Sequence, residues 1–308
     1  MESVINILEN CRLCARSCGA DRIHGEAGRC GGTDKVFAAR SALHMWEEPC
    51  ISGREGSGAV FFSGCPLGCV FCQNRSIALG KTGKEISLPR LAQIFLELQE
   101  QKANNINLVT PTHYVPQIIC AVENARRMGL EIPIVYNTAS YERPETVRML
   151  MGTVDIFLPD LKYYDTALSA KYSFAPDYFD VASKAIREMV SISGKCEFDA
   201  RGMLRKGTVV RHMILPGHTK DSKQILRYLH ETYGDDIYIS IMNQYTPMPG
   251  IGDGFPELAR RVTKREYGRV VDYAIELGME NVFIQEGPTA AESFIPDFDG
   301  TGLILRGD

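Results

Sequence analysis

From residue 57 onward, short apolar, β-branched runs alternate with longer amphipathic stretches. This alternation predicts βαβ units built around a parallel sheet. Several of the runs are continuously apolar, which is typical of strands buried on both faces. We expect strands over residues 59–62, 107–109, 132–136, 155–158, 209–215, 237–241 and 282–284.

The stretches between these runs have the apolar period of helices that pack on a core. Ser87 can N-cap a helix with Pro89 in its first turn, and Gly129 can end the next helix. We expect helices from residue 87 and over 115–128, 145–151, 179–190, 222–233 and 257–277. About six or seven such units predict an α/β fold, a partial (β/α)6 TIM-type barrel, with an open doubly wound sheet as the alternative.

The start of the chain differs from the rest. Its first 56 residues are rich in Cys and Gly and lack a long periodic segment, so we expect a loop-rich cap. We divide the chain into a Cys-rich N-terminal cap, residues 1–56, and a barrel with a C-terminal extension, residues 57–308. Hydrophobic residues make up 44% and charged residues 23%, as in globular proteins with a full core.

Charge and cysteine content narrow the function further. The chain has 34 basic and 38 acidic residues, a net charge of -4, which argues against a general nucleic-acid partner. No apolar run approaches the ~18 residues of a membrane span, and the N-terminus has no signal-peptide pattern. We therefore expect a cytoplasmic protein without a membrane partner. In that compartment the ten cysteines are metal ligands, reactive thiols or core residues rather than disulfides.

Three cysteines share a short loop after the first expected strand. Residues 61–74 read Phe-Phe-Ser-Gly-Cys-Pro-Leu-Gly-Cys-Val-Phe-Cys-Gln-Asn, so Cys65, Cys69 and Cys72 have C-x3-C-x2-C spacing. We call these three the cysteine triad. Three thiolates can each bind one iron of a cubane and leave the fourth iron open for a cofactor or substrate. The alternative is structural zinc, with Cys50 or another residue as the fourth ligand.

The triad spacing, the aromatic residue before its last cysteine and the strand before it resemble the radical S-adenosylmethionine (SAM) superfamily. Further segments resemble the branch of pyruvate formate-lyase activating enzyme and its uncharacterised relatives: residues 56–74, 107–116, 134–137, 155–163 and 210–217. The resemblance implies a partial (β/α)6 barrel and a [4Fe-4S] cluster on the triad, whose open iron is chelated by the amino and carboxylate groups of SAM. It also implies reductive cleavage of SAM to methionine and a 5′-deoxyadenosyl radical.

The same resemblance suggests roles for single residues. Phe71 matches an aromatic beside the SAM adenine, and Asp160 and Lys162 match an Asp-Leu-Lys that contacts SAM. Two residues apart on a strand, Asp160 and Lys162 both point into the barrel mouth, where the ammonium can pair with the methionyl carboxylate. A rim salt bridge is the alternative. Arg211 matches a strand arginine of the activating enzymes, and a structural ion pair is equally open for it.

One segment departs from the family pattern. Members commonly have Gly-Gly-Glu after the second strand, which receives the SAM amino group, but residues 109–113 here read Val-Thr-Pro-Thr-His. Thr112 and His113 are the nearest replacements, through a carbonyl, hydroxyl or imidazole. Asn137, at the end of the third expected strand, is either a partner for a ribose hydroxyl or a strand-end cap.

A second group of cysteines lies in the cap: Cys11, Cys14, Cys18 and Cys30, with glycines around them. We call them the cap cysteines. Four thiolates suit a structural zinc that staples a segment too short for its own core. They also suit a second iron–sulfur cluster that passes electrons inward. The third interpretation is four reduced thiols in a loop-rich cap.

From the resemblance we expect an anaerobic radical SAM oxidoreductase that activates a glycyl radical enzyme by abstracting hydrogen from a glycine. The substrate protein comes in trans, and flavodoxin or ferredoxin is the expected type of electron donor. The first alternative is a radical SAM enzyme that acts on a small molecule, peptide or nucleic acid. The second is a non-catalytic iron–sulfur or zinc redox sensor, which has no need of the Asp160 and Lys162 pair.

Overall fold

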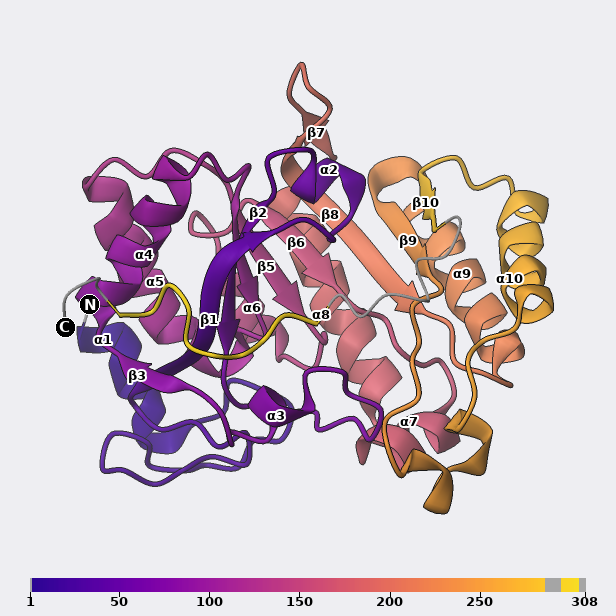
Figure 1. The fold of residues 1–308 in the computed structure, drawn as a ribbon, viewed down its shortest axis with the longest axis horizontal. Coiled ribbons are helices and arrows are strands. Elements are labelled where there is room, and N and C mark those ends of the chain that lie inside the picture. The colour runs from indigo at the N-terminus through magenta and orange to yellow at the C-terminus, as the bar shows by residue number, and fades with distance from the viewer. Residues whose placement is uncertain (1, 286–294, 305–308) are drawn as a thin grey trace.

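A curved, mostly parallel sheet forms the centre of the protein (Figure 1). The computed structural model describes residues 2–285 and 295–304. Its strands are β1 Val36–His44, β2 Ser57–Phe62, β3 Lys84–Ile86, β4 Ile106–Val109, β5 Ile134–Thr138, β6 Ile156–Pro159, β7 Glu197–Phe198, β8 Leu204–Met213, β9 Tyr238–Met242 and β10 Val282–Ile284. They lie in the order β10-β9-β8-β6-β5-β4-β2-β1-β3, and β7 pairs with β8.

All pairings from β2 through β4, β5, β6, β8 and β9 to β10 are parallel, whereas β1, β3 and β7 pair antiparallel with their neighbours. The order begins at β10 and ends at β3, so the sheet is open. Parallel strands joined by helices give the predicted partial (β/α)6 barrel, and the fold-class prediction is confirmed.

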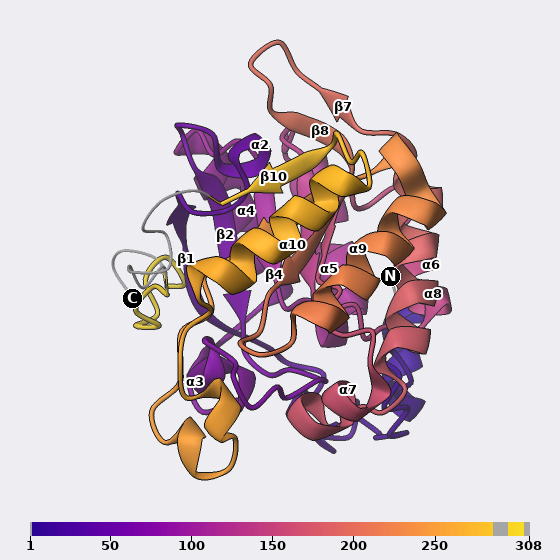
Figure 2. The same ribbon diagram turned by 90° about the vertical axis from the view of Figure 1, so that its right-hand side faces the viewer.

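Helices cover the outer face of the sheet, as the side view shows (Figure 2). They are α4 Leu88–Glu100, α5 Val115–Arg127, α6 Pro144–Arg148, α7 Thr166–Ser173, α8 Tyr178–Ser193, α9 Thr219–Tyr233 and α10 Lys264–Glu276. Three short helices lie elsewhere: α1 Glu2–Ile5, α2 Pro49–Ser52 and α3 Arg75–Ala78. Ser87 caps α4 as expected, because its side chain accepts the backbone N–H of Arg90.

Successive residues of each parallel strand face opposite sides of the sheet. On β5, Ile134 and Tyr136 pack in the apolar layer beneath α4 and α5, whereas Val135 packs inside the barrel. Asn137, two residues after Val135, lines the cavity at the barrel mouth. The two-residue period thus places Val135 and Asn137 on the same, interior side of β5. Val135 lies in the apolar part of the barrel, and Asn137 lies at its mouth.

The segment expected to be a loop-rich cap contains a strand. β1 pairs antiparallel with β2, so the sheet continues across the expected boundary at residue 56. After β1 the chain enters the barrel, where Cys50 and Ile51 of α2 pack against Val135 and Ile156. Cys50 therefore fills the interior at the far end from the triad, and is not its fourth ligand.

The last long helix is shorter than expected. Residues 257–277 contain α10 and, before it, a 3-10 turn at Pro256–Leu258. α10 begins at Lys264 because Thr263 and Glu266 form a capping box, in which each side chain accepts the other residue's backbone N–H. A cap of this kind satisfies the free amides of the first helical turn and fixes the start of the helix.

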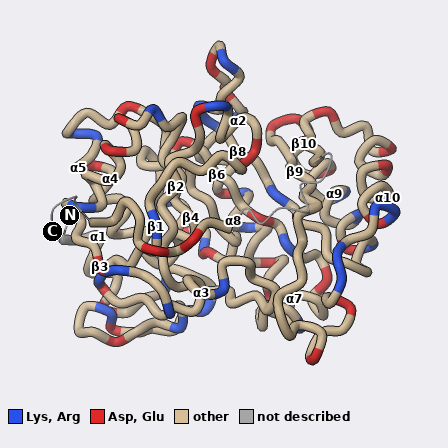
Figure 3. Tube along the Cα trace, in the orientation of Figure 1, with Lys and Arg blue, Asp and Glu red and all other residues tan. Residues whose placement is uncertain are grey.

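Basic and acidic residues alternate along much of the trace (Figure 3). Lys and Arg gather at the start of α10 and in the segment before it, at Arg260, Arg261, Lys264 and Arg265. Glu266 pairs with Arg260 at 2.7 Å, so an acidic side chain offsets part of the positive charge of this group. No helix in the described ranges is long and apolar enough to cross a membrane.

Candidate active site

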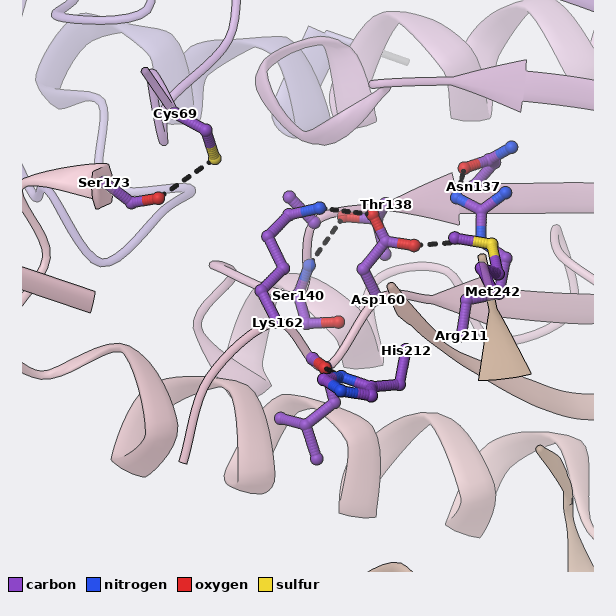
Figure 4. Close-up of polar contacts among 12 residues, drawn as sticks. Cys69, Asn137, Thr138, Ser140, Asp160, Lys162, Ser173, Arg211, His212 and Met242 are labelled. Atoms are coloured by element: carbon purple, nitrogen blue, oxygen red, sulfur yellow. Dashed lines mark hydrogen bonds and ion pairs between the residues drawn. The ribbon is translucent and has the colours of Figure 1, made fainter. Parts of the chain in front are cut away.

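The three triad cysteines lie on the loop that follows β2. Gly64 and Gly68 adopt φ angles of 93° and 76°, which let the backbone turn around the sulfurs. Cys65 donates its backbone N–H to the carbonyl of Cys30 at 3.2 Å. Ser173, at the end of α7, directs its hydroxyl to Cys69 Sγ at 3.0 Å (Figure 4). The loop is therefore held from both the cap and α7.

The triad lines one cavity at the carboxyl ends of the parallel strands, which we call the site cavity. The sequence-predicted residues that line it with the triad are Phe71, Asn137, Asp160, Lys162 and Arg211. They come from four separate elements, since parallel strands bring their ends to one edge of the barrel. Both Asp160 and Lys162 face this cavity, as their two-residue spacing predicts.

Opposite charges fill the wall of the site cavity facing the triad (Figure 4). Asp160 binds Lys162 Nζ at 2.6 Å and Arg211 Nε at 2.8 Å. Arg211 also binds Glu47 at 3.0 Å and donates to Asn137 Oδ1 at 2.6 Å. We call Glu47, Asp160, Lys162 and Arg211 the charge network. Arg211 thus forms structural ion pairs and also lines the site cavity.

The network fixes the charge of its members. Burial alone would raise the pKa of Asp160, but the nearby Arg211 and Lys162 charges outweigh it and lower that pKa. Burial likewise works against the charged form of Lys162, yet Asp160 keeps its pKa above the usual value. An ammonium and a guanidinium that stay charged at neutral pH give this wall an affinity for a carboxylate.

Burial also acts on the triad thiols. It raises the pKa of Cys65 and Cys69, and it raises the pKa of Cys72 to about 12. Lys162 opposes the shift in all three by favouring the thiolate. A metal must displace these protons to bind, and Lys162 lowers the cost of that exchange.

The triad loop packs closely around Gly64. A Cβ on this residue would lie 2.5 Å from the Cys30 carbonyl and 2.9 Å from His113 Nε2, whereas a Cβ on Gly68 meets nothing within 4 Å. We expect Gly64→Ala to add about 1–3 kcal/mol of overpacking to the ~1–2 kcal/mol of backbone strain that both glycines share. Gly68→Ala is the matched control.

The displaced loop should also hold its metal poorly, because supporting contacts are worth roughly 10–100-fold in metal affinity. Iron content after anaerobic reconstitution and urea unfolding of both variants measure this. Equal iron content and stability in Gly64→Ala and Gly68→Ala would show that the contact with Cys30 does not matter.

Thr112 and His113 do not line the site cavity; Thr110 is the threonine of their segment that does. The Thr112 hydroxyl binds the buried carboxyl of Glu142 at 2.6 Å. His113 binds the Ser63 carbonyl at 2.7 Å, and burial lowers its pKa to about 3, so it is a neutral support of the triad loop. Thr110 has φ 59°, and the chain turns there into a 3-10 helix, Thr112–Tyr114, which carries both residues into the core.

Phe71 is buried, 4% exposed, in an aromatic cluster. Its ring makes edge-on contacts with Tyr163, Tyr172 and Tyr245 at 6.2 to 6.5 Å between ring centroids. Phe71 also lines the site cavity. The packing holds the ring in place, as a stacking surface for a flat ligand requires.

Glu47, Ile295 and Pro296 are among the further residues of the cavity wall that were not assigned to it from the sequence. Glu47 lies between β1 and α2, and its carboxylate also accepts from Asn107 and Asn137. Ile295 and Pro296 belong to the tail, the last part of the C-terminal extension. Downstream, Gly300 and Thr301 hydrogen-bond to β1, which anchors this part of the tail across the sheet.

Glu48 adds a titratable group behind the charge network. It is 7% exposed, and its Oε2 has no hydrogen-bond partner among the described residues. Burial raises the pKa of Glu48 to about 7, with Glu47 adding to the shift and Arg211 opposing it. The folded state therefore binds a proton that the unfolded chain, with the ordinary value of 4.5, releases earlier.

Because the pKa of Glu48 is raised in the folded state, the contribution of this group to the free energy of unfolding is fully present below pH 4.5. The contribution is lost as pH rises through 7. The expected loss is roughly 3 kcal/mol. Glu48→Gln should remove this slope, leaving stability near that of wild type at pH 5 and raising it at pH 8. Urea unfolding at the two pH values measures the change, and a slope equal to wild type would show that Glu48 is ionised throughout.

One of the cap cysteines, Cys30, lies against the triad loop, because its carbonyl accepts the backbone N–H of Cys65. Cys11 and Cys30 are buried, Cys14 is half-buried and Cys18 is exposed. Among the described residues no three His, Cys, Asp or Glu side chains are arranged to hold a single metal ion, in the cap or at the triad. Whether the cap binds zinc, a cluster or nothing thus stays a prediction.

Comparison with known proteins identifies the family. Residues 59–229 match the Radical SAM superfamily. This region covers more than half of the chain, and the protein belongs to that superfamily, as the sequence predicts. The family implies a radical enzyme that uses an iron–sulfur cluster and SAM.

Individual relatives are distant. The uncharacterized protein MJ0674 of Methanocaldococcus jannaschii is 25% identical over 292 residues, which are 92% of this chain and 79% of that protein. A domain of pyruvate-formate lyase-activating enzyme from Bacteroides vulgatus is 14% identical, covers 56% of this chain and 92% of that chain, and has a TM-score of 0.40. SuiB of Streptococcus suis bound to S-adenosylmethionine is 15% identical, covers 72% of this chain and 48% of that chain, and has a TM-score of 0.47.

The donor set of the site cavity fits the two groups that the family implies. Three thiols on one loop can bind three irons of a cubane and leave one iron free. Across the same cavity, Lys162 and Arg211 offer cations for a carboxylate, and Phe71 offers an aromatic edge for a flat ring.

Proposed function

We propose that Cys65, Cys69 and Cys72 bind a [4Fe-4S] cluster and that the protein uses it to activate a glycyl radical enzyme. The observation that carries this proposal is that all three thiols and the charged Lys162 line one cavity at the carboxyl ends of the parallel strands. The electrostatic effect of Lys162 on each thiol supports it further.

Bound there, the cluster supplies the electron that cleaves SAM to methionine and a 5′-deoxyadenosyl radical. We propose that Lys162 holds the methionyl carboxylate, with Asp160 keeping the ammonium charged and in place. Phe71 lines the adenine position and Asn137 the ribose position. Thr110 takes the part first given to Thr112 and His113, because it is the threonine on the cavity wall.

The walls of the site cavity serve to keep water from the reacting carbon–hydrogen bond. Ile295 and Pro296 contribute apolar surface on one side, and Met213 and Met242 contribute it on another. A radical formed beside such walls meets the substrate's hydrogen before it meets solvent, provided that the substrate is docked against the opening. The partner we propose is a glycine-containing loop of a separate protein.

A low-potential one-electron donor such as flavodoxin or ferredoxin completes the reaction, and a reducing cytoplasm suits ten free cysteines. Action on a small molecule, peptide or nucleic acid remains the alternative substrate class. A redox sensor without catalysis is the weakest alternative, since the family to which the chain belongs is one of radical enzymes.

The test is anaerobic. Reconstituted protein receives SAM and dithionite, with or without a candidate glycyl radical enzyme, and 5′-deoxyadenosine and the organic radical are measured by mass spectrometry and electron paramagnetic resonance. A glycyl radical that appears only with partner, SAM and reductant supports the proposal. Formation of 5′-deoxyadenosine without any radical on such partners would favour the alternative substrate class, and a well-loaded protein that never cleaves SAM would overturn the proposal.

A further inference from the structure

The cap cysteines surround Gly28. A Cβ at this glycine would lie 3.3 Å from Cys30 Sγ and 3.6 Å from Cys18 Sγ, so these two sulfurs flank it closely. A Cβ at Gly32 would lie 3.4 Å from Cys30 Sγ and 3.1 Å from Arg22 Nη2, and the same guanidinium reaches Cys11 Sγ at 3.5 Å. Cys11, Cys18 and Cys30 therefore gather around one segment of the cap, and Cys14 lies between Cys11 and Cys18 in the sequence.

A buried cation lies beside them. Arg22 is 0% exposed, its Nη1 points to Cys11 Sγ at 3.5 Å, and its Nε and Nη2 donate to the Thr33 carbonyl. No carboxylate pairs with Arg22 in the described parts of the chain. A buried guanidinium needs an anion nearby, because an unpaired charge in the interior is costly. Neutral thiols do not provide that anion, whereas metal-bound thiolates do.

A further donor points at one of the sulfurs. Gly32 directs its backbone N–H to Cys30 Sγ at 3.4 Å. Hydrogen bonds to sulfur stabilise the charge of an iron–sulfur cluster and tune its reduction potential.

The cap is joined directly to the triad loop. Arg16, between Cys14 and Cys18, donates to the carbonyls of Pro66 and Leu67 on that loop at 3.1 and 3.2 Å. The same guanidinium also binds the carbonyls of Ser173 and Phe174 at the end of α7. Arg16 therefore connects the cap both to the triad loop and to the end of α7.

One residue belongs to both groups. Cys30 places its sulfur among the cap cysteines while its carbonyl accepts the N–H of Cys65 at 3.2 Å. The covalent path from Cys30 Sγ to Cys65 Sγ is thus interrupted by a single hydrogen bond. Cys18 is exposed and therefore accessible to a donor protein.

We propose that Cys11, Cys14, Cys18 and Cys30 bind a second iron–sulfur cluster, which relays single electrons to the triad through the Cys30–Cys65 hydrogen bond. The proposal rests on the proposed function of the triad. A low-potential one-electron donor protein is oxidised as the cap site is reduced, and the same electron then passes to the triad site. No bond is made or broken, and no proton moves in the relay.

Metal counting separates this proposal from the function of the triad. We expect about eight irons per chain in reconstituted wild type and about four after alanine replaces either all three triad cysteines or all four cap cysteines. Zinc at the cap, or no iron in the triad-less variant, would overturn the second cluster. Loss of all iron in a folded cap-less variant would instead point against the triad assignment.

Cys18→Ala provides the milder test if the fourfold variant does not fold, because Cys18 is exposed and its loss opens no core cavity. We expect a fall of at least about tenfold in the ratio of flavodoxin-driven to dithionite-driven 5′-deoxyadenosine formation, because the cap site loses its exposed thiolate while three thiolates can still hold iron there. The ratio removes any effect on the triad itself. An unchanged ratio would refute the relay.

Discussion

Cys69→Ala is expected to abolish formation of 5′-deoxyadenosine and to remove the absorbance of the triad cluster. A cubane with two protein ligands no longer has the thiolate that Ser173 positions at 3.0 Å. The loss should exceed about 4 kcal/mol of transition-state stabilisation, or roughly 10³-fold in rate. Mass spectrometry of the nucleoside, together with iron and sulfide analysis on the same sample, measures both effects.

Cys120→Ala is the matched control, since this buried cysteine lies on α5 away from the site cavity. It should lose about 1 kcal/mol of stability, a small core truncation, and keep its iron and its activity. If Cys69→Ala kept its cluster and its product while folded, the triad could not be the ligand set. If both variants lost activity, unfolding would be the cause and far-ultraviolet circular dichroism would show it.

The triad and its opposing residues were accessible from the sequence because their relations are local. The three cysteines lie within one loop, and Asp160 and Lys162 are two residues apart just after β6, where the extended chain still points both to the same side. The rule that parallel strands end at one edge then brings Asn137 to the same cavity. The family resemblance supplied Arg211, which lies near the end of β8 because that strand begins at Leu204 and not at the expected residue 209. No long-range contact had to be guessed for any of these.

Other parts of the site depend on contacts between distant residues. Glu47 meets Arg211 across 164 residues, and Arg40 meets the tail at Asp297 across 257 residues. Neither the loop that carries Glu47 nor the tail has a hydrophobic period that indicates which part of the protein it packs on. β1 was missed for a related reason: its burial does not alternate strictly, so residues 36–44 lack the two-residue period of a half-buried strand.

The fate of Thr112 and His113 shows a different limit. Their sequence position matches the family segment, but the turn at Thr110 directs them inward. A positive φ is uncommon for a β-branched residue, so nothing in the sequence indicated it. The buried Glu142 that binds Thr112 also came from outside the segment, and only the packed structure brings the two together.

Arg211→Met is expected to lower the free energy of unfolding by about 3–5 kcal/mol at pH 7, because it leaves the buried Glu47 without its cation and Asp160 with Lys162 alone. The side chains of Arg211, Glu47 and Asp160 are 14%, 10% and 17% exposed, so solvent replaces little of the lost interaction. Arg205→Met is the control on the same strand, since Arg205 is exposed; it should change stability by less than about 0.5 kcal/mol.

The pH dependence and a double variant identify the cause. The lowered pKa of Asp160 contributes stability above the carboxyl's ordinary value, and this contribution is lost as pH falls through the folded value. The gap between wild type and Arg211→Met should therefore narrow in acid, and Glu47→Gln added to Arg211→Met should recover part of the loss. Urea unfolding at pH 7 and at pH 3, which is below the ordinary carboxyl value of 3.8, measures both. A SAM titration on the same proteins then separates the two roles of Arg211: a variant that is as stable as wild type but binds SAM weakly would mean that the guanidinium is kept for the ligand and not for the fold.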